Sequence, residues 1–136
     1  MKKWILILTL IGSSMIFAGY RTDMISRMKA KEQRIEANYS GQGLSGEVQT
    51  MDEILNAWDY ELNKIYKLLM SKLSTAQKAK LRNEEREWLK RRERKVNSEI
   101  KGTSGGISGR MAYFAIMTGW AEDRAIELAR RYDNLK

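Results

Sequence analysis

The strongest helical pattern in the chain lies between residues 51 and 73, and it limits the possible folds more than any other feature. Its apolar residues are Met51, Ile54, Leu55, Trp58, Leu62, Ile65, Tyr66, Leu69, Met70 and Leu73. This spacing places all of them on one face of an α-helix. Thr50 and Glu53 form the pattern of a capping box, which satisfies free amide groups at a helix start. The pattern therefore predicts a helix over about 51–73 with one buried face.

Two further long helices are predicted downstream. Ser74 and Gln77 repeat the capping pattern and open a helix over about 75–100, and the short connection before it favours an antiparallel hairpin. A Gly/Ser stretch at 101–109 predicts a loop, followed by a last helix from Gly109 or Arg110 to Asp133. The 136 residues contain no proline and many good helix formers. The sequence thus predicts an all-α fold, an antiparallel bundle of three long helices.

The first 47 residues have a different character. Residues 1–19 carry two lysines, an apolar run and small residues, which is typical of a signal peptide cleaved after Ala18 or Gly19. The run is shorter than the roughly 20 residues that span a bilayer, and an uncleaved anchor is the alternative. Residues 20–47 form a charged leading helix with a thin apolar stripe, expected to pack weakly, and a Gly/Ser linker at 40–47. The main helical domain is expected over 48–136, in an exported protein.

Charged residues interrupt the apolar stripes of the last two helices. Glu85 and Arg92 flank Trp88 on the face that also carries Leu81 and Val96, and Arg124 lies within the last stripe. If these faces are buried, the arginines need carboxylate partners, because an unpaired buried charge is costly. The available carboxylates are Asp59, Glu61, Glu85, Glu122 and Glu127. A half-exposed helix whose long side chains reach past the core to water is the other interpretation.

Composition narrows the function classes. The chain has neither cysteine nor histidine, which removes the thiolate nucleophile, the usual proton shuttle and the commonest zinc ligands. The acidic pairs on the helices are expected to be ordinary surface residues, so we predict no enzyme activity, metal or cofactor. The net charge of +8 falls to about +6 without residues 1–19, which favours neutral or anionic partners. Export argues against a nucleic-acid role.

Four segments together resemble a known family. They are DYELNKIYKLLMSKL at 59–73, WLKRRE at 88–93, the glycine pair at 105–106 and AEDRAIEL at 121–128. In order and spacing they resemble the LprI-type lysozyme inhibitor domain, with its Asp-x-x-Leu-Asn-x-x-Tyr stretch, Trp-Leu-x-x-Arg-Asp stretch, Gly/Ser-rich loop and terminal Arg-x-x-x-Leu. The resemblance covers about residues 48–132. It implies a secreted helical domain that binds and inhibits a lysozyme and so protects the cell wall.

The family pattern falls on specific residues, which we call the motif residues. They are Asp59, Leu62, Asn63, Tyr66, Leu69, Trp88, Leu89, Arg92, Glu93, Arg124 and Leu128. Glu93 stands where the family usually has aspartate. Members commonly pair cysteines across the helices, and Val96 and Ile116 occupy two such places here. This chain is expected to be a cysteine-free member whose core packing offsets the missing cross-link, typically worth about 2–4 kcal/mol.

Two partners remain open. A lysozyme of host defence is usually basic, so docking would need a local acidic patch, for which Glu84, Glu85 and Glu87 are the candidates. Alternatively, the basic residues of the same helix would bind anionic lipid or wall polymer in a peripheral contact with the envelope. The residues concerned are Lys90, Arg91, Arg94 and Lys95, with Arg110 and the segment 21–34. Salt sensitivity should separate the two interpretations.

Overall fold

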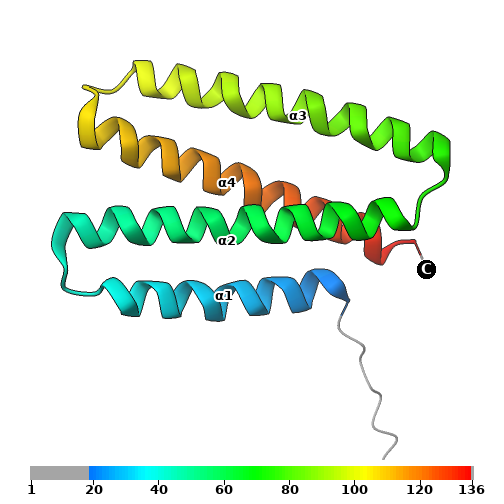
Figure 1. Ribbon diagram of the computed structural model, residues 1–136, viewed down its shortest axis with the longest axis horizontal. Coiled ribbons are helices and arrows are strands. Elements are labelled where there is room, and N and C mark those ends of the chain that lie inside the picture. Colours follow the sequence, from blue (N-terminus) through cyan, green and yellow to red (C-terminus); the bar gives the residue numbers. More distant parts are fainter. Residues whose placement is uncertain (1–18, 136) are drawn as a thin grey trace, which may run out of the picture.

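The computed structural model describes residues 19–135 as four helices joined by short turns (Figure 1). They are α1 (Tyr20–Tyr39), α2 (Gly43–Ser71), α3 (Thr75–Lys101) and α4 (Gly106–Asp133). The predicted all-α class is confirmed, and no strand occurs between residues 19 and 135. No helix in that range is long and apolar enough to cross a membrane. The predicted signal peptide lies almost wholly outside the described residues.

The helices alternate in direction along the chain, so α1 and α3 run antiparallel to α2 and α4 (Figure 1). The most extensive contact joins α2 and α4, α3 packs mainly on α4, and α1 packs on both α2 and α4. The short α2–α3 connection correctly indicates opposite directions. Along most of their length, however, α2 and α3 are separated because α4 is the helix against which α3 packs.

A main apolar core joins all four helices. Its buried members are Met24, Met28, Ala57, Trp58, Leu62, Ile65, Leu69, Leu81, Trp88, Ala121, Ala125, Leu128 and Ala129. The buried alanines of α4 allow α2 and α4 to pack closely, because each alanine places only a methyl group between the two helices. A smaller core of Val48, Leu55 and Phe114 lies between the N-terminal halves of α2 and α4. The predicted stripe over 51–73 is the part of α2 that faces these cores.

The leading helix is packed more firmly than its sequence suggests, so the expectation of a weakly packed helix is wrong. Met24 and Met28 are 0% and 1% exposed, and Ile35 is 5% exposed. Polar contacts add to this packing. Asp133 at the end of α4 accepts hydrogen bonds from the backbone amides of Tyr20 (2.8 Å) and Arg21 (3.0 Å). It thereby caps α1 from another helix, since the first amides of a helix lack partners within it.

The boundary between α1 and α2 also differs from the prediction. The loop is only residues 40–42, and α2 begins at Gly43, so the capping pattern of Thr50 and Glu53 lies inside the helix. A Cβ on Gly46 would stand 2.7 Å from the carbonyl oxygen of Tyr39, too close for any other residue. The glycines thus permit a tight turn beside a helix rather than a flexible linker. Similarly, α4 begins at Gly106, before the predicted start at Gly109 or Arg110.

The start of α3 agrees with the sequence. Ser74 accepts a hydrogen bond from the amide of Gln77 (3.3 Å), and the Gln77 side chain accepts one from the amide of Ser74 (2.9 Å). The predicted capping box is therefore confirmed, and it fixes where α3 begins after its short connection.

Candidate functional site

Residues of α2 and α3 line a groove, which we call the α2–α3 groove. Its volume is about 430 Å³. The lining residues are Asp59, Leu62, Asn63 and Tyr66 from α2 and Arg82, Glu85, Arg86, Trp88, Leu89 and Arg92 from α3. The groove exists because α3 packs on α4 and leaves space beside α2.

An ion pair spans this groove. The Arg92 guanidinium donates to a carboxylate oxygen of Asp59 at 3.2 Å and lies over the Trp88 ring, 4.7 Å from its centroid. Trp88 is only 6% exposed and stacks at a tilt against Trp120 of α4, with ring centroids 6.1 Å apart. These contacts fix α3 to α2 and α4 together. The expected pairing of Arg92 is confirmed, and both walls of the groove are joined at this point.

A second arginine, Arg124, lies behind the groove and binds one of its lining residues. Arg124 of α4 is 5% exposed, and its Nε and Nη2 atoms donate to one carboxylate oxygen of Glu85, at 3.0 and 2.9 Å. Its Nη1 atom donates to Glu127 at 2.8 Å. Three donors on one guanidinium are thus satisfied, as a buried charge requires. The expected pairing of Arg124 is confirmed, with two of the predicted carboxylates as partners.

Arg131 extends this network toward the surface. It donates to Glu84 at 2.6 Å and to Glu127, so two arginines and three carboxylates link α3 to α4. Burial alone would raise the pKa of Glu127, but the hydrogen bonds and charges of Arg124 and Arg131 outweigh it and lower that pKa below its ordinary value. For Arg131, the same two acids raise the pKa despite partial burial. The charged forms are therefore the stable ones here.

Of the motif residues, most that are polar or exposed gather at the α2–α3 groove. Asp59, Leu62, Asn63, Tyr66, Trp88, Leu89 and Arg92 all line it. Glu93 is exposed on the adjoining stretch of α3 and lines a neighbouring hollow together with Leu89 and Arg92. Leu69 and Leu128 are fully buried, so they serve the core. Arg124 lies behind the groove and supports it through Glu85.

The three acidic residues expected to form a patch at the start of α3 each form an ion pair with a different basic residue. Glu85 is bound to Arg124 and Glu84 to Arg131, so neither carboxylate is free of a cation. Glu87 is exposed and pairs with Lys90 at 2.9 Å. The basic residues Arg91, Arg94 and Lys95 are all exposed, and Lys95 pairs with Glu99. The structure thus brings the acidic candidates into ion pairs and leaves the basic ones toward solvent.

Two groove residues, Arg82 and Arg86, were not among the candidate site residues. With the motif residue Leu89 they are spaced by four and three residues, which places all three on one face of α3. Leu89 is 45% exposed. This helical spacing around Leu89 is the signal in the sequence that could have identified the two arginines.

The groove has the chemistry of a binding surface. An exposed leucine lines it, an amide and a tyrosine line its α2 side, and an ion pair joins its two walls. Such a combination of exposed apolar and polar side chains is typical of protein–protein contacts. Between residues 19 and 135, no three residues of the metal-ligating types come together.

Comparison with known proteins gives one result. The family model described as lysozyme inhibitor LprI matches residues 37–128. The match includes α2, α3 and most of α4, whereas most of α1 precedes it. No curated protein and no solved structure matches the chain. Because the match covers more than half of the sequence, the chain belongs to the LprI lysozyme inhibitor family.

Proposed function

We propose that the protein is exported and that it binds a lysozyme through the α2–α3 groove, so that the enzyme no longer degrades the cell wall. One observation carries this proposal beyond family membership: five of the six motif residues that are not buried in the core line a single solvent-facing groove. They are Asp59, Asn63, Tyr66, Leu89 and Arg92, and the sixth, Glu93, lines the neighbouring hollow. Residues needed only for folding would be expected in the core, where Leu69 and Leu128 lie. The signal-like segment at 1–19 supports export.

The ion pairs that hold the groove in shape favour tight binding. Arg92 fixes its α2–α3 span, and Arg124 fixes Glu85 from behind. A preformed surface loses little conformational freedom when a partner docks, so more of the contact energy appears as affinity. Leu89, exposed on the α3 wall, offers an apolar contact to a docking partner, beside Tyr66 and Arg92, which are of the residue types that most often dominate binding energy in interfaces.

Charge affects how the two proteins meet. Without residues 1–19 the chain still carries about +6, so a basic lysozyme is repelled at long range and the encounter is slow at low salt. Affinity must then come from close contacts, which salt screens weakly. Inhibition should therefore persist at moderate ionic strength.

The test is lysis of a peptidoglycan suspension by lysozymes of several classes, with and without the purified mature chain, at low and moderate salt. The proposal expects stoichiometric inhibition of at least one class at both salt concentrations. Absence of inhibition of every class, with a correctly folded chain, would refute it.

A basic envelope-binding module is the second candidate, favoured by the exposed Arg91, Arg94 and Lys95 on the outer helix α3. Each exposed cation near an anionic surface contributes about 1 kcal/mol. Cosedimentation with wall material or anionic vesicles that disappears at high salt, without any inhibition, would support this function instead. The variant Arg91→Glu/Arg94→Glu should abolish such cosedimentation and leave lysozyme inhibition intact.

A further inference from the structure

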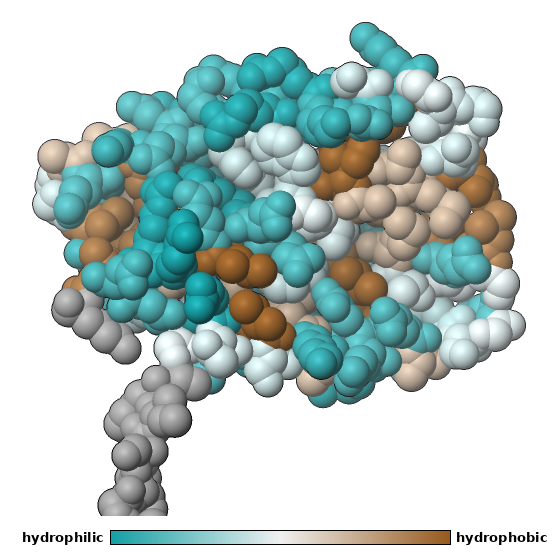
Figure 2. Space-filling view, turned by 180° about the vertical axis from the view of Figure 1, so that it is seen from behind, coloured by the Kyte–Doolittle hydropathy of each residue, from teal (hydrophilic) through white to brown (hydrophobic). Residues whose placement is uncertain are grey.

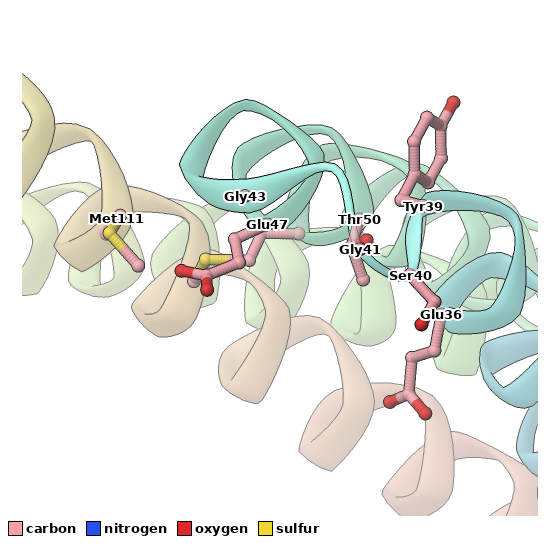
Figure 3. Close-up of a pocket in the computed structure, with 9 residues that line it drawn as sticks. Glu36, Tyr39, Ser40, Gly41, Gly43, Glu47, Thr50 and Met111 are labelled. Carbon is pink, nitrogen blue, oxygen red and sulfur yellow. The ribbon is translucent and has the colours of Figure 1, made fainter.

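A second pocket lies at the opposite end of α2 from its α3 junction, beside the α1–α2 turn, and we call it the turn pocket (Figure 3). Its volume is about 400 Å³. Met51 of α2 and Met111 of α4 supply its apolar surface, and Glu36 of α1 and Glu47 of α2 supply its carboxylates. Figure 3 shows the Glu47 side chain extending toward Met111, whereas the Tyr39 ring is turned away.

The shape of the pocket follows from the backbone. Gly41 and Gly43 have φ values of 79° and 62°, a left-handed conformation that favours glycine and reverses the chain within three residues. At this end of the bundle, α2 lies between α1 and α4 (Figure 1), and all three helices contribute residues to the pocket. Figure 2, the opposite view, shows a broad apolar area at the same end. Leu44 and Ile107, 47% and 48% exposed, belong to the helix starts there.

The charges of the turn pocket are not balanced within the protein. Among residues 19–135, no lysine or arginine lies within ion-pair distance of Glu36 or Glu47. This contrasts with the α3–α4 network, where each carboxylate has an arginine. Nearby, the Tyr39 hydroxyl donates to Glu53, and this hydrogen bond, followed by burial and the charges of Glu53 and Asp52, raises the pKa of Tyr39. The turn pocket is thus locally negative and partly lined by methionines, although the whole chain has a net charge of +8.

We infer that the turn pocket receives a lysine- or arginine-bearing segment of a partner protein, which is the lysozyme if the proposed function holds. The aliphatic part of such a side chain can lie on Met51 and Met111, since methionine adapts its shape to irregular apolar contacts. The cationic ends of such side chains then pair with Glu47, whose side chain extends toward Met111, or with Glu36 at the other side of the pocket (Figure 3), as long basic side chains place their charge at the polar edge of an apolar surface. The pocket supplies the local complementarity that the overall charge of the chain does not provide.

The test uses the full mature chain labelled with ¹³C at the methionine methyl groups. The variant Glu36→Gln/Glu47→Gln removes the two charges, and Glu99→Gln/Asp123→Asn removes two exposed charges elsewhere as a matched control. Lysozyme should shift the methyl signals of Met51 and Met111 and leave those of the buried Met24 and Met28 unchanged. The pocket variant should bind roughly tenfold more weakly at low salt, and the control less than twofold.

The outcomes separate this inference from the proposed function. If lysozyme is inhibited equally by the wild type and the pocket variant, and the Met51 and Met111 signals do not shift, the inference is wrong and the proposed function stands. If no lysozyme binds, the proposed function fails, and a short peptide of lysine, arginine and leucine becomes the probe. A shift of Met51 and Met111 with this peptide, absent in the pocket variant, then supports the inference. No shift with the peptide overturns it.

Discussion

The ion pair between Arg124 and Glu85 offers the sharpest test of how the groove is held. We predict that Arg124→Met destabilises the protein more than Arg92→Met. Arg124 is 5% exposed and its partner Glu85 has 16% side-chain exposure, so Glu85 would be left largely buried without a cation. Asp59, the partner of Arg92, is 35% exposed and can turn to water instead.

Magnitudes follow from these exposures. Removing one partner of a buried pair costs about 3–5 kcal/mol, and the residual exposure of Glu85 places Arg124→Met near the lower end, at about 3 kcal/mol. Arg92→Met breaks a partly exposed pair and a contact with Trp88, for a loss of about 1 kcal/mol. The double variant Arg124→Met/Glu85→Leu removes both charges and should recover much of the loss.

Urea unfolding followed by circular dichroism measures these differences, with thermal unfolding as a second readout. For a domain of this size, each kcal/mol lowers the melting temperature by about 3–5 °C. Equal losses for Arg124→Met and Arg92→Met would refute the reasoning from burial. A double variant no more stable than Arg124→Met would show that the unpaired carboxylate is not the cause.

Two further predictions concern other charges. Asp133→Ala removes the cap of α1 and should lower the free energy of unfolding by about 1 kcal/mol. Relative to the wild type, amide hydrogen exchange should become faster in α1 and change less in α3. Unchanged exchange in α1 would contradict the capping role. The pKa of Glu127 in the folded protein lies below its ordinary value of 4.5, because Arg124 and Arg131 stabilise the charged carboxylate. These two partners therefore stabilise the fold fully above pH 4.5, and the stabilisation is lost as the pH falls through the lower, folded-state pKa. Glu127→Gln should therefore be less stable than wild type at neutral pH, and the difference in urea midpoint should shrink below about pH 4; a constant difference would oppose this.

Local patterns predicted the helices well. The capping box at Ser74 and the periodic stripe of α2 arise from contacts between neighbouring residues, so the sequence alone displays them. The charged positions inside the stripes also indicated buried pairs, because an arginine on an apolar face needs a carboxylate. Arg92 and Arg124 both have one.

Long-range contacts were not predictable in the same way. The thin apolar stripe of α1 has few members, but periodicity measures their spacing and not their depth, and Met24 and Met28 are completely buried. Its cap, Asp133, is more than a hundred residues away. Glycine content suggested a linker at 40–47, yet Gly46 is required where α2 passes the end of α1.

The candidate site was predictable in part. The resemblance identified Asp59, Asn63 and Tyr66, but only the packing of α3 on α4 shows that they share one groove with Leu89. The acidic patch looked suitable for docking because the sequence did not reveal Arg124 and Arg131 as partners of Glu85 and Glu84.

The most direct test of the central claim is a titration of lysozyme activity with the mature chain and two matched variants. Leu89→Asp places a charge in the lining of the α2–α3 groove, and Ile25→Asp places one at a similarly exposed position on α1, with exposures of 45% and 41%. We predict stoichiometric inhibition by the wild type and Ile25→Asp and at least tenfold weaker inhibition by Leu89→Asp. Equal inhibition by both variants, with folding verified by circular dichroism, would show that the groove is not the inhibitory surface.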